Sequence, residues 1–154
     1  MHEVYLDYNA SAPVRPQAAR AVLEALEDNI GNPSSIHGAG HRAKVILETS
    51  RRRVASLLGA LPEELCFTSG GTESNNMAPR GAAASRKAGH LILTAIEHAS
   101  VLETAKDLRR RGFHVTRVLP DAEGWVRPET LLAQVRPETF LVSLMHSSHE
   151  VGTL

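Results

Sequence analysis

The sequence predicts an α/β protein with a largely parallel sheet. Segments of helical periodicity alternate along the chain with short apolar runs that resemble buried strands. Neighbouring parallel strands need a crossover connection, usually a helix, so this alternation is typical of the class. No low-complexity linker or internal repeat interrupts the pattern, and 154 residues are enough to bury a sizeable core.

Two helices are expected in the first part of the chain. The first begins with Pro16, which suits the opening turn of a helix, and runs to about residue 28. Turn-forming residues at 31–35 separate it from a second helix over about 40–58. Both segments carry apolar residues at helical spacing. These are Ala18, Val22, Ala25 and Leu26 in the first, and Ala43, Ile46, Leu47, Val54 and Leu57 in the second.

Strands and helices alternate through the rest of the sequence. Strands are expected at residues 65–67, 90–94, 113–119 and 139–145. Helices are expected at residues 75–84, 100–111 and 128–135. Ser100 is expected to cap its helix, with Glu103 completing a capping box. Cys66 lies in the first apolar run, where we expect a small buried hydrophobe rather than a nucleophile.

Composition narrows the classes of partner and compartment. Acidic and basic residues balance at 17 each, so charge gives no reason to expect nucleic acid or an anionic membrane as a partner. The single cysteine excludes a disulfide within the chain. The first residues lack the features of a signal peptide, and no apolar run reaches the roughly 18 residues of a membrane helix. A soluble cytoplasmic protein is therefore expected.

The segment at residues 68–76 has the composition of a phosphate-binding loop. Its glycine pair allows a close approach of the backbone, and the helix expected after it presents free N–H groups. Ser69, Thr72 and Ser74 add hydroxyl donors. The segment matches neither a P-loop nor GxGxxG, which favours a phosphate-bearing cofactor other than ATP or NAD. The alternative is an ordinary turn between a strand and a helix, capped by Thr72 or Ser74.

The last predicted strand leads into residues 146–154, where the sequence stops. Sites in open α/β sheets lie just beyond the carboxyl ends of the strands. The chain is therefore expected to end inside a functional loop and to be one part of a longer protein.

Five blocks of sequence occur in an order that carries a family resemblance. They lie at residues 5–14, 31–37, 67–76, 97–103 and 145–152. Together they resemble the N-terminal part of the cysteine desulfurases, pyridoxal-phosphate enzymes of the class V aminotransferase group. Each block alone is a weak to moderate signal, whereas five in order span essentially the whole chain.

The resemblance implies the three-layer α/β sandwich of fold type I pyridoxal-phosphate enzymes, with a mostly parallel sheet. Residues 16–154 would be the incomplete N-terminal portion of the large cofactor-binding domain. Residues 1–15 would form a short N-terminal arm that belongs with the small domain. Family members are homodimers with sites at the subunit interface, and the block at 31–37 is implied to lie near that interface.

The resemblance also implies roles for individual residues. Gly71 and Thr72 would bind the cofactor phosphate. His98 would lie on the pyridine ring and move protons, a role that suits an imidazole because it titrates near neutrality. The residues implied to contact the substrate are Asn9, Ala10 and Asn32.

His149 departs from the family pattern, which has an asparagine there that bonds the phenolic oxygen of the cofactor. A ring N–H of His149 could donate the same bond. A metal site formed by His146, His149 and Glu150 is the alternative. It is disfavoured because these residues follow a strand instead of sharing a helix face, so no metal is expected.

By the same resemblance, several groups that the chemistry needs lie downstream of this chain. They are the lysine that holds the cofactor covalently, the aspartate paired with the pyridine nitrogen, the arginine that binds the substrate carboxylate and the cysteine that takes up sulfur. Lys44, Lys87 and Lys106 lie on predicted helix faces in charged surroundings and are expected to be surface residues. The chain alone is therefore expected to be inactive.

The activity implied for the parent protein is the removal of sulfur from L-cysteine. The products are L-alanine and an enzyme persulfide for iron–sulfur cluster or thio-cofactor assembly, with a sulfur-acceptor or scaffold protein as partner. Selenocysteine lyase, or another class V lyase or aminotransferase, is an alternative because the discriminating cysteine loop lies downstream. A non-catalytic remnant that acts through protein–protein association is a further alternative.

Overall fold

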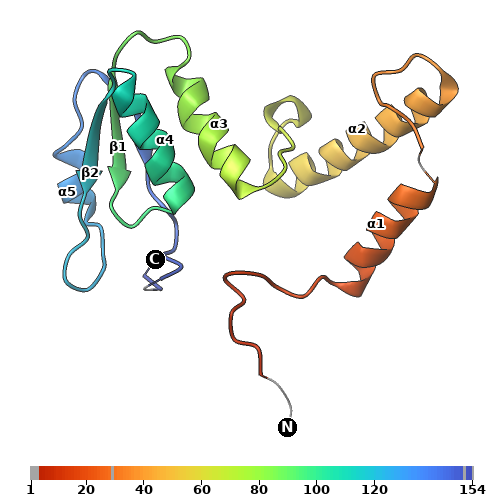
Figure 1. Cartoon of the computed structure of the whole chain (residues 1–154), viewed down its shortest axis with the longest axis horizontal. Helices are drawn as coiled ribbons and strands as arrows, with labels where there is room; N and C mark the ends of the chain where they lie inside the picture. Colours follow the sequence, from red (N-terminus) through yellow and green to blue (C-terminus); the bar gives the residue numbers. More distant parts are fainter. Residues whose placement is uncertain (1–3, 29, 151, 154) are drawn as a thin grey trace. The chain divides into compact units, whose positions relative to one another are not determined.

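The computed structural model describes residues 4–28, 30–150 and 152–153. The chain comprises two compact units, Met1–Phe67 and Thr68–Leu154, and each is considered by itself. Figure 1 follows the elements along the chain. The predicted division into an arm at 1–15 and a domain at 16–154 stays a prediction.

The first unit contains two α-helices and a short 3-10 helix. Helix α1 spans Pro16–Asp28, helix α2 spans Gly38–Leu58, and the 3-10 helix η1 spans Pro62–Glu64. Helix α2 begins earlier than predicted because Nδ1 of His37 accepts a hydrogen bond from the Gly40 N–H at 3.3 Å. It ends at Gly59, whose left-handed backbone (φ 66°) is the conformation that favours glycine at this position.

The predicted strand at residues 65–67 is wrong, since this segment has irregular backbone. The Leu65 carbonyl accepts a hydrogen bond from Arg51 Nη1 at 2.6 Å, so a side chain takes the place of a strand partner. The same guanidinium lies 5.0 Å from the centre of the Phe67 ring. Cys66 is exposed, and the prediction that it is a buried hydrophobe is also wrong.

The second unit is built on a parallel sheet of three strands in the order β2-β1-β3, which confirms the predicted α/β class. Its strands are β1 (His90–Thr94), β2 (His114–Val118) and β3 (Thr139–Ser143). Its helices are α3 (Gly71–Ala83), α4 (Ala99–Arg110) and α5 (Pro128–Leu132). Each strand follows a helix or a long connection, as parallel pairing requires.

The strand order explains the layers on either side of the sheet. The chain moves from β1 to β2 in one direction and from β2 across β1 to β3 in the other. Because such crossovers are right-handed, α4 and α5 must cover opposite faces. Figure 1 shows α4 on one side of β1 and β2 and α5 on the other.

The core lies between the sheet and helices α3 and α4. Leu91 and Leu93 of the central strand point into it and are almost fully buried. They pack with apolar side chains from both helices and from the residue just before β2. These partners are Ala83, Val101, Ala105, Leu108 and Phe113. Ile92 is fully buried as well, so β1 is covered on both faces, as a near-continuous apolar strand requires.

A fully buried histidine at the amino end of β1 contacts both neighbouring strands. His90 Nδ1 lies 2.8 Å from Thr139 Oγ1, and His90 Nε2 lies 2.8 Å from Thr116 Oγ1. The Thr139 hydroxyl oxygen also accepts the Arg136 N–H at 2.8 Å, which leaves its proton for Nδ1. With that proton donated to Nδ1, His90 Nε2–H donates to Thr116, and both nitrogens of a neutral ring have a partner.

Several predicted boundaries differ from the structure. Helix α3 begins at Gly71 instead of residue 75, and Gly70 is its N-cap. Helix α4 begins at Ala99 with His98 as its N-cap, so the predicted Ser100 cap is wrong. Lys87 lies in a bend after α3 instead of on a helix. Within the described residues, no helix combines the length and apolarity needed to cross a membrane.

Candidate functional site

The loop before α3 is held by its own polar side chains. The N–H and the hydroxyl of Ser69 both donate to Glu73 Oε2, at 2.6 and 2.7 Å. These two bonds lower the pKa of the Glu73 carboxyl. The hydroxyls of Thr68 and Ser74 are hydrogen-bonded to each other at 2.8 Å. Ser69 and Ser74, which the sequence suggested as donors to a ligand, therefore serve the loop itself.

Gly71 and Thr72 are among the residues of the loop whose donors remain. Their N–H groups lie in the first turn of α3, where no helical acceptor exists, and they have no partner in the described part of the chain. The Thr72 hydroxyl has none there either, and the residue is exposed. A Cβ built on Gly70 or Gly71 would meet no atom within 4 Å, so the space before them is open. This donor set at a positive helix end fits a phosphate group.

A network of asparagine and hydroxyl side chains fixes this loop relative to α4. Asn76 Nδ2 donates to the Thr72 carbonyl at 2.8 Å. Asn76 Oδ1 accepts from the Thr104 hydroxyl of α4 at 2.9 Å. Asn75 Nδ2 donates to the Ser100 hydroxyl of α4, also at 2.9 Å. The polar side chains of α3 therefore connect the candidate phosphate site to the first turn of α4.

His98 lies at the start of α4, beyond the carboxyl end of β1. Its Nδ1 accepts the Ser100 N–H at 3.1 Å and lies 2.7 Å from the Ser100 hydroxyl. The residue is exposed, so the rest of its ring is accessible to a ligand. The turn that precedes His98 is connected to β3 by a hydrogen bond. The Ser143 hydroxyl donates to Oε1 of buried Glu97 at 3.1 Å.

The structure brings His149 close to His98. The two ring centres are 5.8 Å apart and the rings are inclined at 51°. His149 Nε2 also lies 3.9 Å from Glu150 Oε1. The loops after β1 and β3 meet at this edge because the carboxyl ends of parallel strands lie side by side. Within the described residues, no three His, Cys, Asp or Glu side chains group closely enough to hold a metal ion.

The predicted substrate residues belong to the first unit. Asn32 organises the turn before α2, since its Oδ1 accepts the Ser34 N–H at 2.9 Å. A Cβ on Gly40 would lie 2.4 Å from the Ser35 carbonyl oxygen, which explains the glycine there. Asn9 and Ala10 lie in an exposed turn. The predicted contacts of Asn9, Ala10 and Asn32 with a substrate stay predictions.

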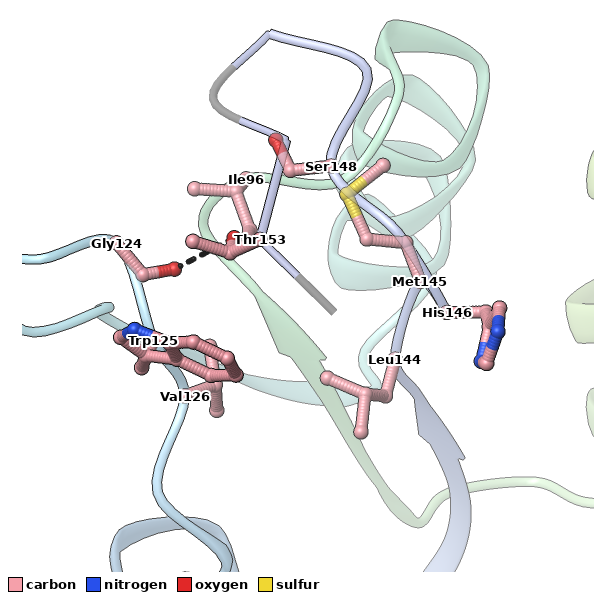
Figure 2. Close-up of a pocket in the computed structure, with 9 residues that line it drawn as sticks. All are labelled: Ile96, Gly124, Trp125, Val126, Leu144, Met145, His146, Ser148 and Thr153. Carbon is pink, nitrogen blue, oxygen red and sulfur yellow. Dashed lines mark hydrogen bonds between the residues drawn. The ribbon is translucent and has the colours of Figure 1, made fainter.

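A hollow of about 320 Å³ lies beside the carboxyl ends of the strands (Figure 2). Ile96, Trp125 and Leu144 give it apolar walls, and the Thr153 hydroxyl closes one side by donating to the Gly124 carbonyl at 3.0 Å. Neither the donors of Gly71 and Thr72 nor His98 line it. The candidate site is therefore defined by the loop before α3 and by His98, not by this hollow.

The sequence identified Gly71, Thr72, His98 and His149 as site residues but missed the residues that position them. Asn75, Ser100 and Glu97 have no separate motif. Asn75 and Ser100 are polar side chains where two helices face each other, and Glu97 is a buried carboxylate in the turn before α4; these features become visible once the packing is known.

Known proteins resemble this chain over nearly all of its length. A family model described as class-V aminotransferase matches residues 4–154. Cysteine desulfurase IscS of Dictyoglomus turgidum is 44% identical over 154 residues, which cover 99% of this chain and 39% of that relative. IscS of Azotobacter vinelandii is also 44% identical, over 98% of this chain and 39% of its own length.

Solved structures agree with these relatives. A NifS-like protein superimposes with a TM-score of 0.90 and 38% identity, over 96% of this chain and 41% of its own. A structure described as SspA in complex with cysteine gives a TM-score of 0.87 and 37% identity, over 94% and 42% of the two chains. The present chain thus spans 39% of the length of the curated relatives given above.

Proposed function

The chain belongs to the class-V aminotransferase family, and we propose that it is the N-terminal part of a pyridoxal-phosphate-dependent cysteine desulfurase. The complete enzyme takes sulfur from L-cysteine and leaves L-alanine and an enzyme persulfide. The observation that carries this proposal is the set of unused donors on Gly71 and Thr72, held by one polar network in a fixed relation to His98. The relatives named cysteine desulfurase support the choice of substrate.

The residues of this chain would hold the cofactor through its phosphate and its ring. Gly71 and Thr72 would bind the phosphate with two N–H groups and a hydroxyl. His98 would present its exposed ring to the flat face of the cofactor and hold a proton at a ring nitrogen. His149 would donate a ring N–H to the phenolic oxygen. When bound, pyridoxal phosphate supplies the electron sink for bond changes at the amino acid.

We assign none of the lysines of this chain to that site. Lys106 forms an ion pair with Glu103 on the surface of α4, and Lys44 and Lys87 are exposed. We therefore assign the covalent lysine, and the cysteine that receives sulfur, to the part of the enzyme that follows this chain. The complete enzyme would act as a cytoplasmic homodimer and pass its sulfur to an acceptor or scaffold protein.

The test uses the complete protein from its natural reading frame. Alanine formation from L-cysteine is measured for the unaltered protein and for Thr72→Ala and His98→Ala. Thr72→Ala is expected to weaken cofactor binding, and His98→Ala to lower alanine formation about 100-fold or more, the usual contribution of a positioned proton-transfer group. His114→Ala removes an exposed histidine of β2 and serves as the matched control. Alanine formation that is absent in the unaltered protein, or unchanged in His98→Ala, would contradict the proposal.

A further inference from the structure

Three polar side chains form a connected line from α3 to the His98 ring. Asn75 Nδ2 lies 2.9 Å from Ser100 Oγ, and Ser100 Oγ lies 2.7 Å from His98 Nδ1. A fourth group, the Ser100 N–H, reaches the same Nδ1 at 3.1 Å. All four atoms are close enough for ordinary hydrogen bonds.

The backbone contact fixes the protonation of Nδ1. A backbone N–H can only donate, so His98 Nδ1 must offer a lone pair to it. A neutral imidazole carries its proton on the other nitrogen in that case. The neutral His98 ring therefore has its proton on Nε2.

The side-chain contacts complete this arrangement. The Asn75 amide nitrogen can only donate, so it occupies a lone pair of the Ser100 hydroxyl oxygen. Because Nδ1 carries a lone pair, the contact between it and the hydroxyl requires the hydroxyl proton to be directed to Nδ1. Ser100 is 9% exposed, so little water competes for this proton. Both donors that reach Nδ1 thus belong to one residue, and Asn75 orients one of them.

We propose that Asn75 and Ser100 form a directed hydrogen-bond relay that keeps neutral His98 in the tautomer with its proton on Nε2. They are positioning residues, since neither is expected to touch a ligand. Under the proposed function, on which this consequence rests, His98 meets the cofactor or substrate as an N–H donor through Nε2. A second proton on the ring would go to Nδ1 and would require the Ser100 hydroxyl to rotate.

The tautomer can be measured directly on the 154-residue chain. The chain is labelled with ¹⁵N at histidine, and a long-range ¹H–¹⁵N correlation spectrum is recorded at a pH where the rings are neutral. The two nitrogens of each ring have separate shifts that report which one is protonated. His98 is expected to show the pattern of a protonated Nε2. A protonated Nδ1 as the main form would overturn the proposal.

Two variants test the relay itself. Ser100→Ala removes one neutral hydrogen bond to Nδ1 and should raise the population of the Nδ1–H tautomer about fivefold. Asn75→Asp presents only acceptors to the Ser100 hydroxyl, draws its proton away from His98 and should raise that population at least as much. Unchanged His98 shifts in both variants would also overturn the proposal.

Further measurements distinguish a change in the hydrogen-bond relay from unfolding of a variant. Ser100→Thr keeps the hydroxyl and should retain the original His98 pattern. The signals of His114, an exposed residue on β2, should be the same in every variant and act as the internal control. If Ser100→Ala disturbs the amide spectrum of the whole unit, Ser100→Thr and Asn75→Asp decide the question. The spectra need no cofactor, so they can fail while the desulfurase activity stands, and the reverse also holds.

Discussion

The buried His90 should make the second unit sensitive to acid. The ring is fully buried and uses both nitrogens, with Thr139 on one side and Thr116 on the other. Burial lowers its pKa from the ordinary 6.5, and the positive charge of Arg136 acts in the same direction. A protonated ring would have to donate at Nδ1, where the Thr139 hydroxyl proton now lies.

The direction in which stability changes with pH follows from the pKa of His90 in the unfolded chain and its lower pKa in the folded chain. The unfolded chain takes up the His90 proton near pH 6.5, whereas the folded chain takes it up only at lower pH. The contribution of the neutral ring to stability is complete above about pH 6.5 and is lost as the pH falls towards the folded-state pKa. The loss reaches at most about 1.4 kcal/mol for each pH unit in that window.

Two variants separate the hydrogen bond from the titration. Thr116→Val keeps the shape of the side chain but leaves the His90 Nε2–H buried without an acceptor, which should lower the free energy of unfolding by about 1–3 kcal/mol. His90→Phe removes the titrating ring. It should be less stable than the unaltered chain at neutral pH, and the difference should narrow as the pH falls below about 6.5.

Urea unfolding followed by far-ultraviolet circular dichroism, at a series of pH values, measures these free energies. His146→Phe replaces an exposed histidine in the loop after β3 and controls for the loss of a histidine as such. A stability difference between the unaltered chain and His90→Phe that is constant with pH would refute the reasoning. So would a Thr116→Val variant as stable as the unaltered chain.

Three further predictions concern the cofactor and the association state. The isolated chain should bind pyridoxal phosphate weakly or not at all, because we assign the covalent lysine to the part of the enzyme that follows this chain. Visible absorbance measures binding, and borohydride reduction should trap no adduct on one defined lysine. The chain should self-associate, since apolar residues such as Val22, Leu26 and Leu57 are exposed on α1 and α2; a monomer by light scattering at micromolar concentration would contradict this. In the complete enzyme, His149→Asn should preserve cofactor binding but change how the cofactor absorbance responds to pH, because asparagine does not titrate. An identical pH profile would remove any chemical role for His149.

The strands show where an apolar run is a sufficient signal and where it is not. The run at 90–94 was predicted with its observed bounds because it is buried on both faces, and a central parallel strand must be apolar along its length. The run at 65–67 looked similar but forms no strand. The Leu65 carbonyl is satisfied by the Arg51 guanidinium from α2, a pairing that spans 14 positions of sequence. Local sequence does not report such a partner.

Part of the candidate site could also be predicted from local sequence, and part of it could not. The glycine pair before α3 predicted an anion site, because glycine and a free helix end are local features. Which hydroxyls remain for a ligand could not be predicted, since that depends on Glu73 turning back to Ser69. The capping of α4 was assigned to Ser100, whereas His98 is the cap and Ser100 supports it. The donor to Ser100 is Asn75, which lies 25 positions away and is brought close only by the packing of α3 on α4.

Under the proposed function, the polar contacts between α3 and α4 would orient the ligand, and groups elsewhere in the complete enzyme would perform the covalent steps. Asn76 ties the backbone of Thr72 to Thr104, and Asn75 ties α3 to Ser100 and through it to His98. A phosphate bound at the start of α3 and a ring contacting His98 would therefore be held at a fixed separation by one pair of helices. All of these bonds lie inside the second unit, so the binding geometry does not depend on the groups that perform the covalent steps. Under the proposed function, those groups would be brought to a ligand that this unit orients, and fixed orientation is a large part of what an enzyme contributes to rate.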